Sequence, residues 1–323
     1  MENVAAMRER VSTSETELTT DEARFASPGG AELPARCYRI RSHGNSLAVS
    51  EWGDAEAPPL LLAHGGFDFA QTFCRFAPLL AAGGYRIISW DQRGHGDSEH
   101  TALYSWEADM RDALAVLDTI CHEPVPFVGH SKGGSLLIQL ALACPHRVSH
   151  LVSIDGLPSR SAQPDVADHE RTSRFAREVA GWLDHRRRSA LRQRPPGSLE
   201  DLARRRGRMN PRLDHEWLCF LVTRGARRDA DGWRWKIDPA LRFGGFGPWR
   251  PDWALQRLPS LSPPLLGLLA GQREPMGFDS NLEDLAPFLP RHTEIERFEK
   301  AGHFIHIEEP APVANRILEF LKS

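Results

Sequence analysis

Residues 127–137 read FVGHSKGGSLL, and this stretch indicates the fold. It places Ser131 in a G-x-S-x-G pattern, with an apolar run on either side. Such a serine sits on a sharp strand-to-helix turn in one class of enzyme, but the same letters also occur in ordinary loops. The pattern alone does not separate these two interpretations. The rest of the chain has to supply a base, an acid and donors for an oxyanion.

The segments around this stretch alternate between apolar runs and helical spacing. Strands are expected at 35–42, 46–52, 58–63, 85–91, 125–130, 148–155, 263–271 and 292–299. Helical spacing occurs at 72–84, 105–120, 132–145, 281–289 and 310–323. This alternation predicts an α/β fold with a mostly parallel, eight-stranded sheet flanked by helices.

One long segment breaks the alternation. Residues 156–260 hold 22 of the 40 Lys and Arg but only 13 of the 43 Asp and Glu, and six of the nine tryptophans. Such a shift in composition indicates a separately built region. We therefore expect a helical cap at 157–260, inserted between the sixth and seventh strands of a core formed by 34–156 and 261–323. Residues 1–33 are expected to form a flexible N-terminal arm.

Composition excludes several classes of protein. Of the 323 residues, 41% are hydrophobic and 26% charged, without the run of about 20 apolar residues that spans a bilayer. The start of the chain is polar and has no apolar signal core, which predicts a cytoplasmic protein.

Five scattered cysteines without C-x-x-C spacing predict free thiols and no zinc site. The arginine runs at 186–188 and 204–206 are interpreted as solvated helix faces, so no nucleic-acid or membrane partner is expected. The oligomeric state is not predicted.

Chemically active side chains follow the predicted strands at one edge of the sheet, where ligands of parallel α/β folds bind. Ser131 is the expected nucleophile, and a serine hydroxyl needs a base, which His303 can supply. A carboxylate must then hold the histidine in the right tautomer. Glu274, after the seventh strand, is the expected acid, and Asp155, after the sixth, is the alternative. His306 lies near His303 in the chain and is the competing histidine.

The oxyanion of a tetrahedral intermediate needs backbone donors. The helix expected from Lys132 presents free N–H groups and its positive dipole end at the serine. The loop after His64 is close to the same strand end. We expect the N–H groups of Gly66 and Lys132 to form the oxyanion hole.

Five motifs, in this order along the chain, resemble those of the α/β-hydrolase superfamily from about residue 36 to the C-terminus. They are HGG at 64–66, DQRGHGDS at 91–98, GHSKGG at 129–134, GQRE at 271–274 and AGHFIHIEEP at 301–310. The resemblance implies a serine hydrolase with a helical cap, and a structural loop for DQRGHGDS. Two positions depart from the family pattern. Family members more often have an aspartate at the position of Glu274 and an uncharged residue at the position of Lys132.

The predicted function is therefore that of an esterase-like serine hydrolase acting on an ester, thioester, lactone or related acyl bond of a small molecule, through an acyl-enzyme. No cofactor or metal is implied. A serine at position 131 argues against epoxide and haloalkane hydrolases of this fold, which use an aspartate. Carbon–carbon bond hydrolysis and cofactor-free perhydrolysis use the same triad and stay open. So does a slow-turnover ligand receptor, which would turn over about once where an enzyme turns over many times.

Overall fold

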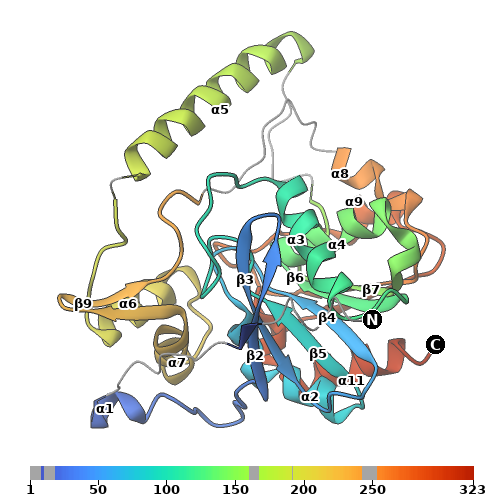
Figure 1. Ribbon diagram of the computed structural model, residues 1–323. Coiled ribbons are helices and arrows are strands. Elements are labelled where there is room, and N and C mark those ends of the chain that lie inside the picture. Colours follow the sequence, from blue (N-terminus) through green and yellow to red (C-terminus); the bar gives the residue numbers. More distant parts are fainter. Residues whose placement is uncertain (1–8, 11–18, 160–166, 191, 242–252) are drawn as a thin grey trace.

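The computed structural model describes residues 9–10, 19–159, 167–190, 192–241 and 253–323 (Figure 1). Within them, a sheet of nine strands has the order β1-β2-β3-β5-β4-β6-β7-β10-β11. Its strands are β1 (Glu9–Arg10), β2 (Arg36–Ser42), β3 (Asn45–Trp52), β4 (Pro59–Ala63), β5 (Arg86–Trp90), β6 (Val125–His130), β7 (Val148–Ile154), β10 (Leu265–Ala270) and β11 (Thr293–Phe298). From β5 to β11 the neighbours are parallel, whereas β1, β2 and β3 are antiparallel additions at one side. The eight expected strands are present, and β1 is a two-residue extension.

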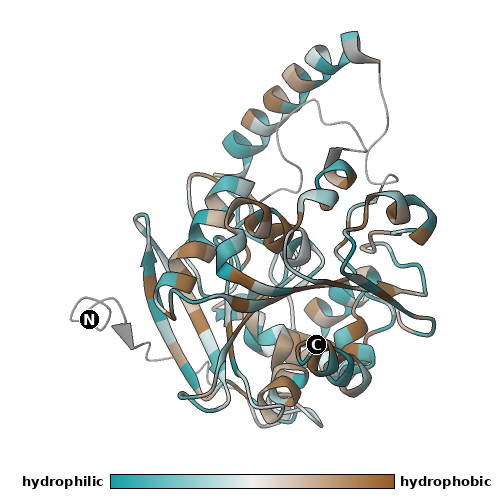
Figure 2. Ribbon diagram, turned by 90° about the vertical axis from the view of Figure 1, so that its right-hand side faces the viewer, coloured by the Kyte–Doolittle hydropathy of each residue, from teal (hydrophilic) through white to brown (hydrophobic). Residues whose placement is uncertain are grey.

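Helices cover both faces of the sheet, as Figure 2 shows. Alternate residues of each strand point to opposite faces, so Leu60 and Leu62 of β4 join one apolar cluster and Leu61 and Ala63 join another. The first cluster includes residues of α2 (Ala77–Ala82) and α11 (Pro310–Phe320), and the second includes residues of α3 (Trp106–Asp118) and α4 (Lys132–Ala143). Shorter helices are η2 (Ala70–Arg75), η3 (Pro145–Arg147), α9 (Leu282–Leu285), η6 (Ala286–Phe288) and α10 (Ile305–Glu308). The predicted α/β fold, with a buried and mostly parallel sheet, is confirmed.

The segment between β7 and β10 is called the insertion here. Its described elements are α5 (Asp168–Ser189), α6 (Leu199–Met209), α7 (His215–Gly225), β8 (Ala226–Asp229), β9 (Gly232–Trp235), α8 (Trp253–Gln256) and η5 (Leu258–Ser260). Its described part is mainly helical and also contains the antiparallel β8–β9 hairpin. The rings of Trp217 and Phe220 in α7 stack with their centroids 4.7 Å apart. Both residues belong to the same apolar cluster as Phe69 and Phe73. The α6–α7 pair therefore packs on the sheet domain, whereas α5 extends away from it (Figure 1).

The described part of the N-terminal region contacts the insertion. Glu22 lies in α1 (Thr20–Ala23) and accepts hydrogen bonds from Trp233 Nε1 at 2.8 Å and Arg228 Nη1 at 2.7 Å. Phe25 is buried in the apolar cluster that contains Trp217. We expected residues 1–33 to form a flexible arm; within it, Glu22 and Phe25 contact other parts of the chain, and residues 1–8 and 11–18 lie outside the described residues.

None of the helices in the described ranges combines the length and the apolar character needed to span a bilayer.

Candidate active site

Ser131 occupies a strained turn between β6 and α4. Its backbone has φ 54° and ψ −122°, a conformation that costs free energy for a residue with a side chain. Two glycines make this turn possible. A Cβ on Gly133 would lie 2.3 Å from the carbonyl oxygen of Ala63, and one on Gly129 would lie 2.6 Å from the backbone of Gly133. The helix thus begins directly against the sheet, with the serine at the apex of the turn.

His303 lies in the loop between β11 and α10 and is almost fully buried. Its Nδ1 is 2.6 Å from Oδ2 of Asp155, which follows β7 and is buried as well. The other carboxylate oxygen, Oδ1, accepts the backbone N–H of Ala270 at 3.2 Å. When Nδ1 carries the ring proton and donates it in a hydrogen bond to Asp155, Nε2 is the ring nitrogen left as a base. Ser131 and His303 line the same cavity.

Glu274 contacts the same loop at a different atom. Its Oε2 accepts the backbone N–H of His303 at 2.6 Å. Burial raises the pKa of Glu274, and the nearby charge of Glu308 raises it further. The expectation that Glu274 holds the ring of His303 is therefore wrong in this structure, and Asp155, the alternative, occupies that place. Both acids follow strands close to the serine-bearing β6, since β7 is its neighbour and β10 is the next strand, but Asp155 contacts the ring whereas the carboxylate of Glu274 is bonded to the backbone N–H.

The two expected oxyanion donors flank the serine. Gly65 approaches so closely that a Cβ there would lie 3.2 Å from the Cβ of Ser131. Gly66 lines the same cavity as Ser131, and the N–H of Phe67 donates to Nε2 of His95 at 3.2 Å. Lys132 starts α4, so its N–H belongs to the unpaired first turn of the helix.

The side chain of Lys132 points away from the site. Its Nζ donates to Asp109 at 2.7 Å and to Gln92 at 2.5 Å. This ion pair explains a lysine at a position where the family usually has an uncharged residue. The backbone of Lys132, directly after Ser131 at the start of α4, is the part of this residue next to the serine.

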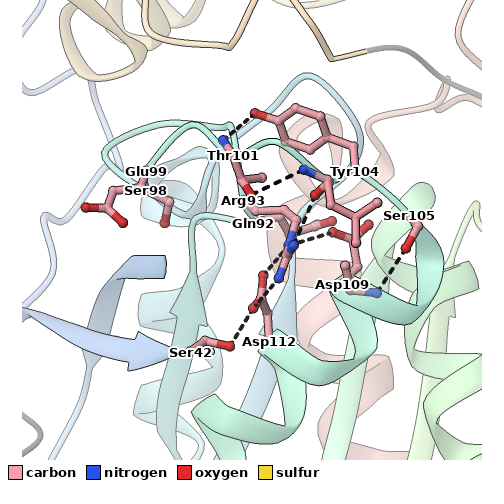
Figure 3. A network of polar contacts seen from close by, with 12 residues as sticks. Ser42, Gln92, Arg93, Ser98, Glu99, Thr101, Tyr104, Ser105, Asp109 and Asp112 are labelled. Carbon is pink, nitrogen blue, oxygen red and sulfur yellow. Dashed lines mark hydrogen bonds and ion pairs between the residues drawn. The ribbon is translucent and has the colours of Figure 1, made fainter. Parts of the chain in front are cut away.

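A buried polar network holds the loop that follows β5 (Figure 3). Arg93 forms a two-pronged ion pair with Asp112, at 2.7 and 2.8 Å, and Ser42 donates to the same carboxylate at 2.5 Å. A third donor of the guanidinium bonds the carbonyl oxygen of Leu103 at 3.0 Å. The charged residues of the DQRGHGDS motif thus brace the loop, in agreement with a structural role.

The other histidines near the site are buried neutral groups. Burial lowers the pKa of His64 and of His306 to about 3, and it lowers the pKa of His95 and of His130 as well. His306 packs against Phe73 at 5.2 Å between ring centroids, and neither of its nitrogens has a hydrogen-bond partner among the described residues. His306 is therefore a core residue, whereas His303 lines the cavity together with the buried His130.

The cavity at Ser131 has a volume of about 260 Å³. The sheet domain contributes Gly65, Gly66, Phe67, His130, Ser131, Met276, His303 and Phe304, and helix α6 with its C-terminal cap contributes Arg206, Met209 and Asn210. The last three residues were not predicted from the sequence. The spacing of Arg206 and Asn210 could have indicated them, because residues four apart lie on one face of a helix. The buried Leu202 precedes Arg206 by the same interval.

A second polar cluster lies on the insertion. Glu200, His215 and Cys219 each have a side-chain atom of a kind that can bind a metal ion, and these three atoms lie within 4.8 Å of one another. The sequence did not predict this cluster. His215 Nε2 is 2.9 Å from Glu200 and 3.5 Å from the sulfur of Cys219, and burial raises the pKa of that thiol to about 12. These side chains bond to one another and do not line the cavity at Ser131.

The sequence around this site matches a known protein family. Residues 58–310 match the family described as the alpha/beta hydrolase fold. The chain belongs to this family. The matched range includes the turn at Ser131, the carboxylate of Asp155 and the loop of His303.

Individual relatives narrow the type of enzyme. The chain is 27% identical over 270 residues to the sn-1-specific diacylglycerol lipase ABHD11 of Mus musculus, covering 83% of this chain and 82% of the mouse protein. It is 25% identical over 299 residues to a probable serine hydrolase of Drosophila melanogaster, covering 88% and 87% of the two chains. Among solved structures, the thioesterase domain from the curacin biosynthetic pathway shares the fold with a TM-score of 0.74 at 23% identity, covering 88% of this chain and 98% of that one. The protein is accordingly an esterase-like serine hydrolase of the α/β-hydrolase fold.

Proposed function

We propose that the protein hydrolyses an ester, thioester, lactone or related acyl bond of a small molecule through a triad of Ser131, His303 and Asp155. The observation that carries this proposal is the 2.6 Å contact between His303 Nδ1 and Asp155 Oδ2, beside a serine held in a strained turn at the same cavity. The family and its lipase and hydrolase relatives support the reaction class.

The reaction begins when Oγ of Ser131 attacks the substrate carbonyl carbon. His303 Nε2 accepts the hydroxyl proton, and Asp155 stabilises the imidazolium that forms. The negative charge that develops on the carbonyl oxygen is bound by the N–H groups of Gly66 and Lys132. Losing one such donor costs on the order of 3 kcal/mol of transition-state stabilisation.

Collapse of the tetrahedral intermediate breaks the acyl bond. His303 returns its proton to the leaving group, and the acyl group stays on Ser131 as an ester. Water then enters, His303 takes one of its protons, and the resulting hydroxide displaces the serine. The acid product leaves with the acyl group, and the serine recovers its proton.

The insertion is proposed to act as a cap over this site. Helix α6 and its C-cap residue supply three of the residues that line the cavity, so the insertion bounds the space available to the acyl group. A cavity of about 260 Å³ favours a small or narrow acyl group over a bulky one.

The decisive experiment is covalent labelling with a fluorophosphonate, read by intact mass. We expect one adduct on the unmodified protein and none on Ser131→Ala. Ser135→Ala is the matched control, because Ser135 lies one helical turn further on and donates to the carbonyl oxygen of Gly156. Labelling of a folded protein that survives Ser131→Ala would overturn the proposal.

Turnover separates an enzyme from a receptor with the same triad. We expect p-nitrophenyl acetate and butyrate to be hydrolysed over many turnovers per molecule. A burst of about one product per protein, followed by no further release, would contradict hydrolysis as the function and favour the receptor.

A further inference from the structure

We infer that Arg206 and Asn210 form a recognition site for a carboxylate at the far end of the acyl substrate. The inference rests on the proposed function, because it concerns the cavity of Ser131. It assigns a substrate class, namely acyl compounds that carry a second, anionic group, such as half-esters of dicarboxylic acids.

The first observation is the charge in the cavity wall. Among the described residues that line the cavity, Arg206 is the only one with a permanent charge. Much of the remaining lining is apolar, with Met209, Met276, Phe67 and Phe304. A guanidinium in a largely apolar wall binds an anion more strongly than one in water, because the local dielectric constant is lower.

The second observation is the number of unused donors on Arg206. Its five N–H groups make one hydrogen bond in the described structure, from Nη1 to the carbonyl oxygen of Phe67 at 3.0 Å. Nε is buried without a partner. The guanidinium also lies 5.7 Å from the ring centroid of Phe304, a contact that helps to orient its plane. A carboxylate is the group whose two oxygens match this planar set of donors.

Asp68 is the counter-charge that has to be considered. Its Oδ2 is 3.6 Å from Nη2 of Arg206, which is longer than a charged hydrogen bond, and its side chain is not part of the cavity lining. Burial raises the pKa of Asp68, and the charge of Arg206 opposes this rise. Asp68 thus forms an ion pair with Nη2 of Arg206 from outside the cavity wall, while Nε has no partner among the described residues.

The third observation is Asn210, the C-cap residue of α6. It is buried, with 1% of its surface exposed, and its Nδ2 has no hydrogen-bond partner among the described residues. Buried amide donors are nearly always bonded, so this one calls for an acceptor. It shares with Arg206 the helix face that borders the cavity, and a carboxylate there can accept from both side chains.

The test compares p-nitrophenyl hemiglutarate and hemiadipate with neutral p-nitrophenyl esters of the same length, after subtraction of the uncatalysed rates. We expect kcat/KM of the unmodified enzyme to be about 10- to 100-fold higher for the carboxylate esters. Arg206→Gln should lower kcat/KM for the carboxylate esters far more than for the neutral esters, mainly through KM, so that the preference is lost. Arg206→Lys should restore part of it, because the charge returns without the planar fork.

Two further variants sharpen the result. Asn210→Asp places a negative charge in the cavity and should lower kcat/KM for the carboxylate esters selectively. Arg204→Gln is the control, because Arg204 lies on the same helix but is 66% exposed and paired with Asp201. It should leave both substrate classes unchanged.

The outcomes distinguish this inference from the proposed function. Equal rates for the two substrate classes, or an equal loss of both in Arg206→Gln, would overturn the inference, because Arg206 would then only hold the Phe67 loop. Fluorophosphonate labelling and hydrolysis of neutral esters would survive that outcome. If labelling and all ester hydrolysis were absent, the proposed function would fall and the inference with it.

Discussion

The ends of β7 and β10 both deliver a carboxylate to His303, but to different atoms. Asp155, after β7, contacts the ring at Nδ1, whereas Glu274, after β10, accepts the backbone N–H of the same residue. In the proposed triad, the first contact sets the tautomer and stabilises a positive ring. The second would fix the position of the loop that carries the ring. We therefore propose separable roles for the two acids at neighbouring strand ends, one electrostatic and one positional.

The largest expected effect is that of Asp155→Asn. An amide at Nδ1 favours the wrong tautomer and does not stabilise the imidazolium, so kcat should fall about 10³- to 10⁴-fold. The measurement is steady-state hydrolysis of p-nitrophenyl butyrate, with thermal unfolding to establish that the variant is folded. A loss smaller than tenfold would remove Asp155 from the triad.

A much smaller effect is expected from Glu274→Gln. The glutamine oxygen can still accept the N–H of His303, so kcat should change by less than about tenfold. Glu274→Ala is the sharper partner variant, because it leaves that buried N–H without an acceptor and should lower the free energy of unfolding by about 1–3 kcal/mol. If Glu274→Gln lost activity as severely as Asp155→Asn, the division between the two strand ends would be wrong.

The smallest effect on catalysis is expected from His306→Leu, which tests whether the neighbouring histidine is only a core residue. The unfolded chain binds a proton at His306 below about pH 6.5, whereas the folded protein does so only near pH 3. Stability therefore falls as the pH drops through this window, by up to about 1.4 kcal/mol per pH unit for one histidine.

The variant should lose this contribution. We expect urea unfolding between pH 6 and 4 to show a shallower fall in stability for His306→Leu than for the unmodified protein, with kcat within about threefold. An unchanged slope would mean that His306 is protonated in the folded state, and a large loss of kcat would give it a part in the reaction.

Much of the fold and part of the site follow from local patterns. Apolar runs bounded by glycine and proline predicted the strands, because a parallel sheet is buried on both faces. The same patterns placed Ser131 and His303 at the carboxyl edge of that sheet. Both predictions depend on short stretches of chain whose conformation is encoded nearby.

The choice of acid could not be made in this way. Asp155 and Glu274 follow equally plausible strands, and only the folded structure shows that Asp155 contacts the ring and Glu274 the backbone N–H. Arg206 was grouped with its neighbours in a solvated arginine run. Arg204 and Arg205 are indeed exposed, but the helix turns Arg206 toward the cavity. The packing of Phe25 against the insertion could not be predicted from the sequence either, because it joins segments almost 200 residues apart.

The sequence by itself determined the α/β class, the strained turn at Ser131 and the position of the loop of His303, because each depends on hydrophobic periodicity and on glycines next to one another in the chain. The tertiary structure alone decided which acid contacts the ring of His303 and which residues of the insertion line the cavity at Ser131. These are contacts between groups far apart in sequence, and their energies depend on strand order and helix docking, which no local pattern specifies.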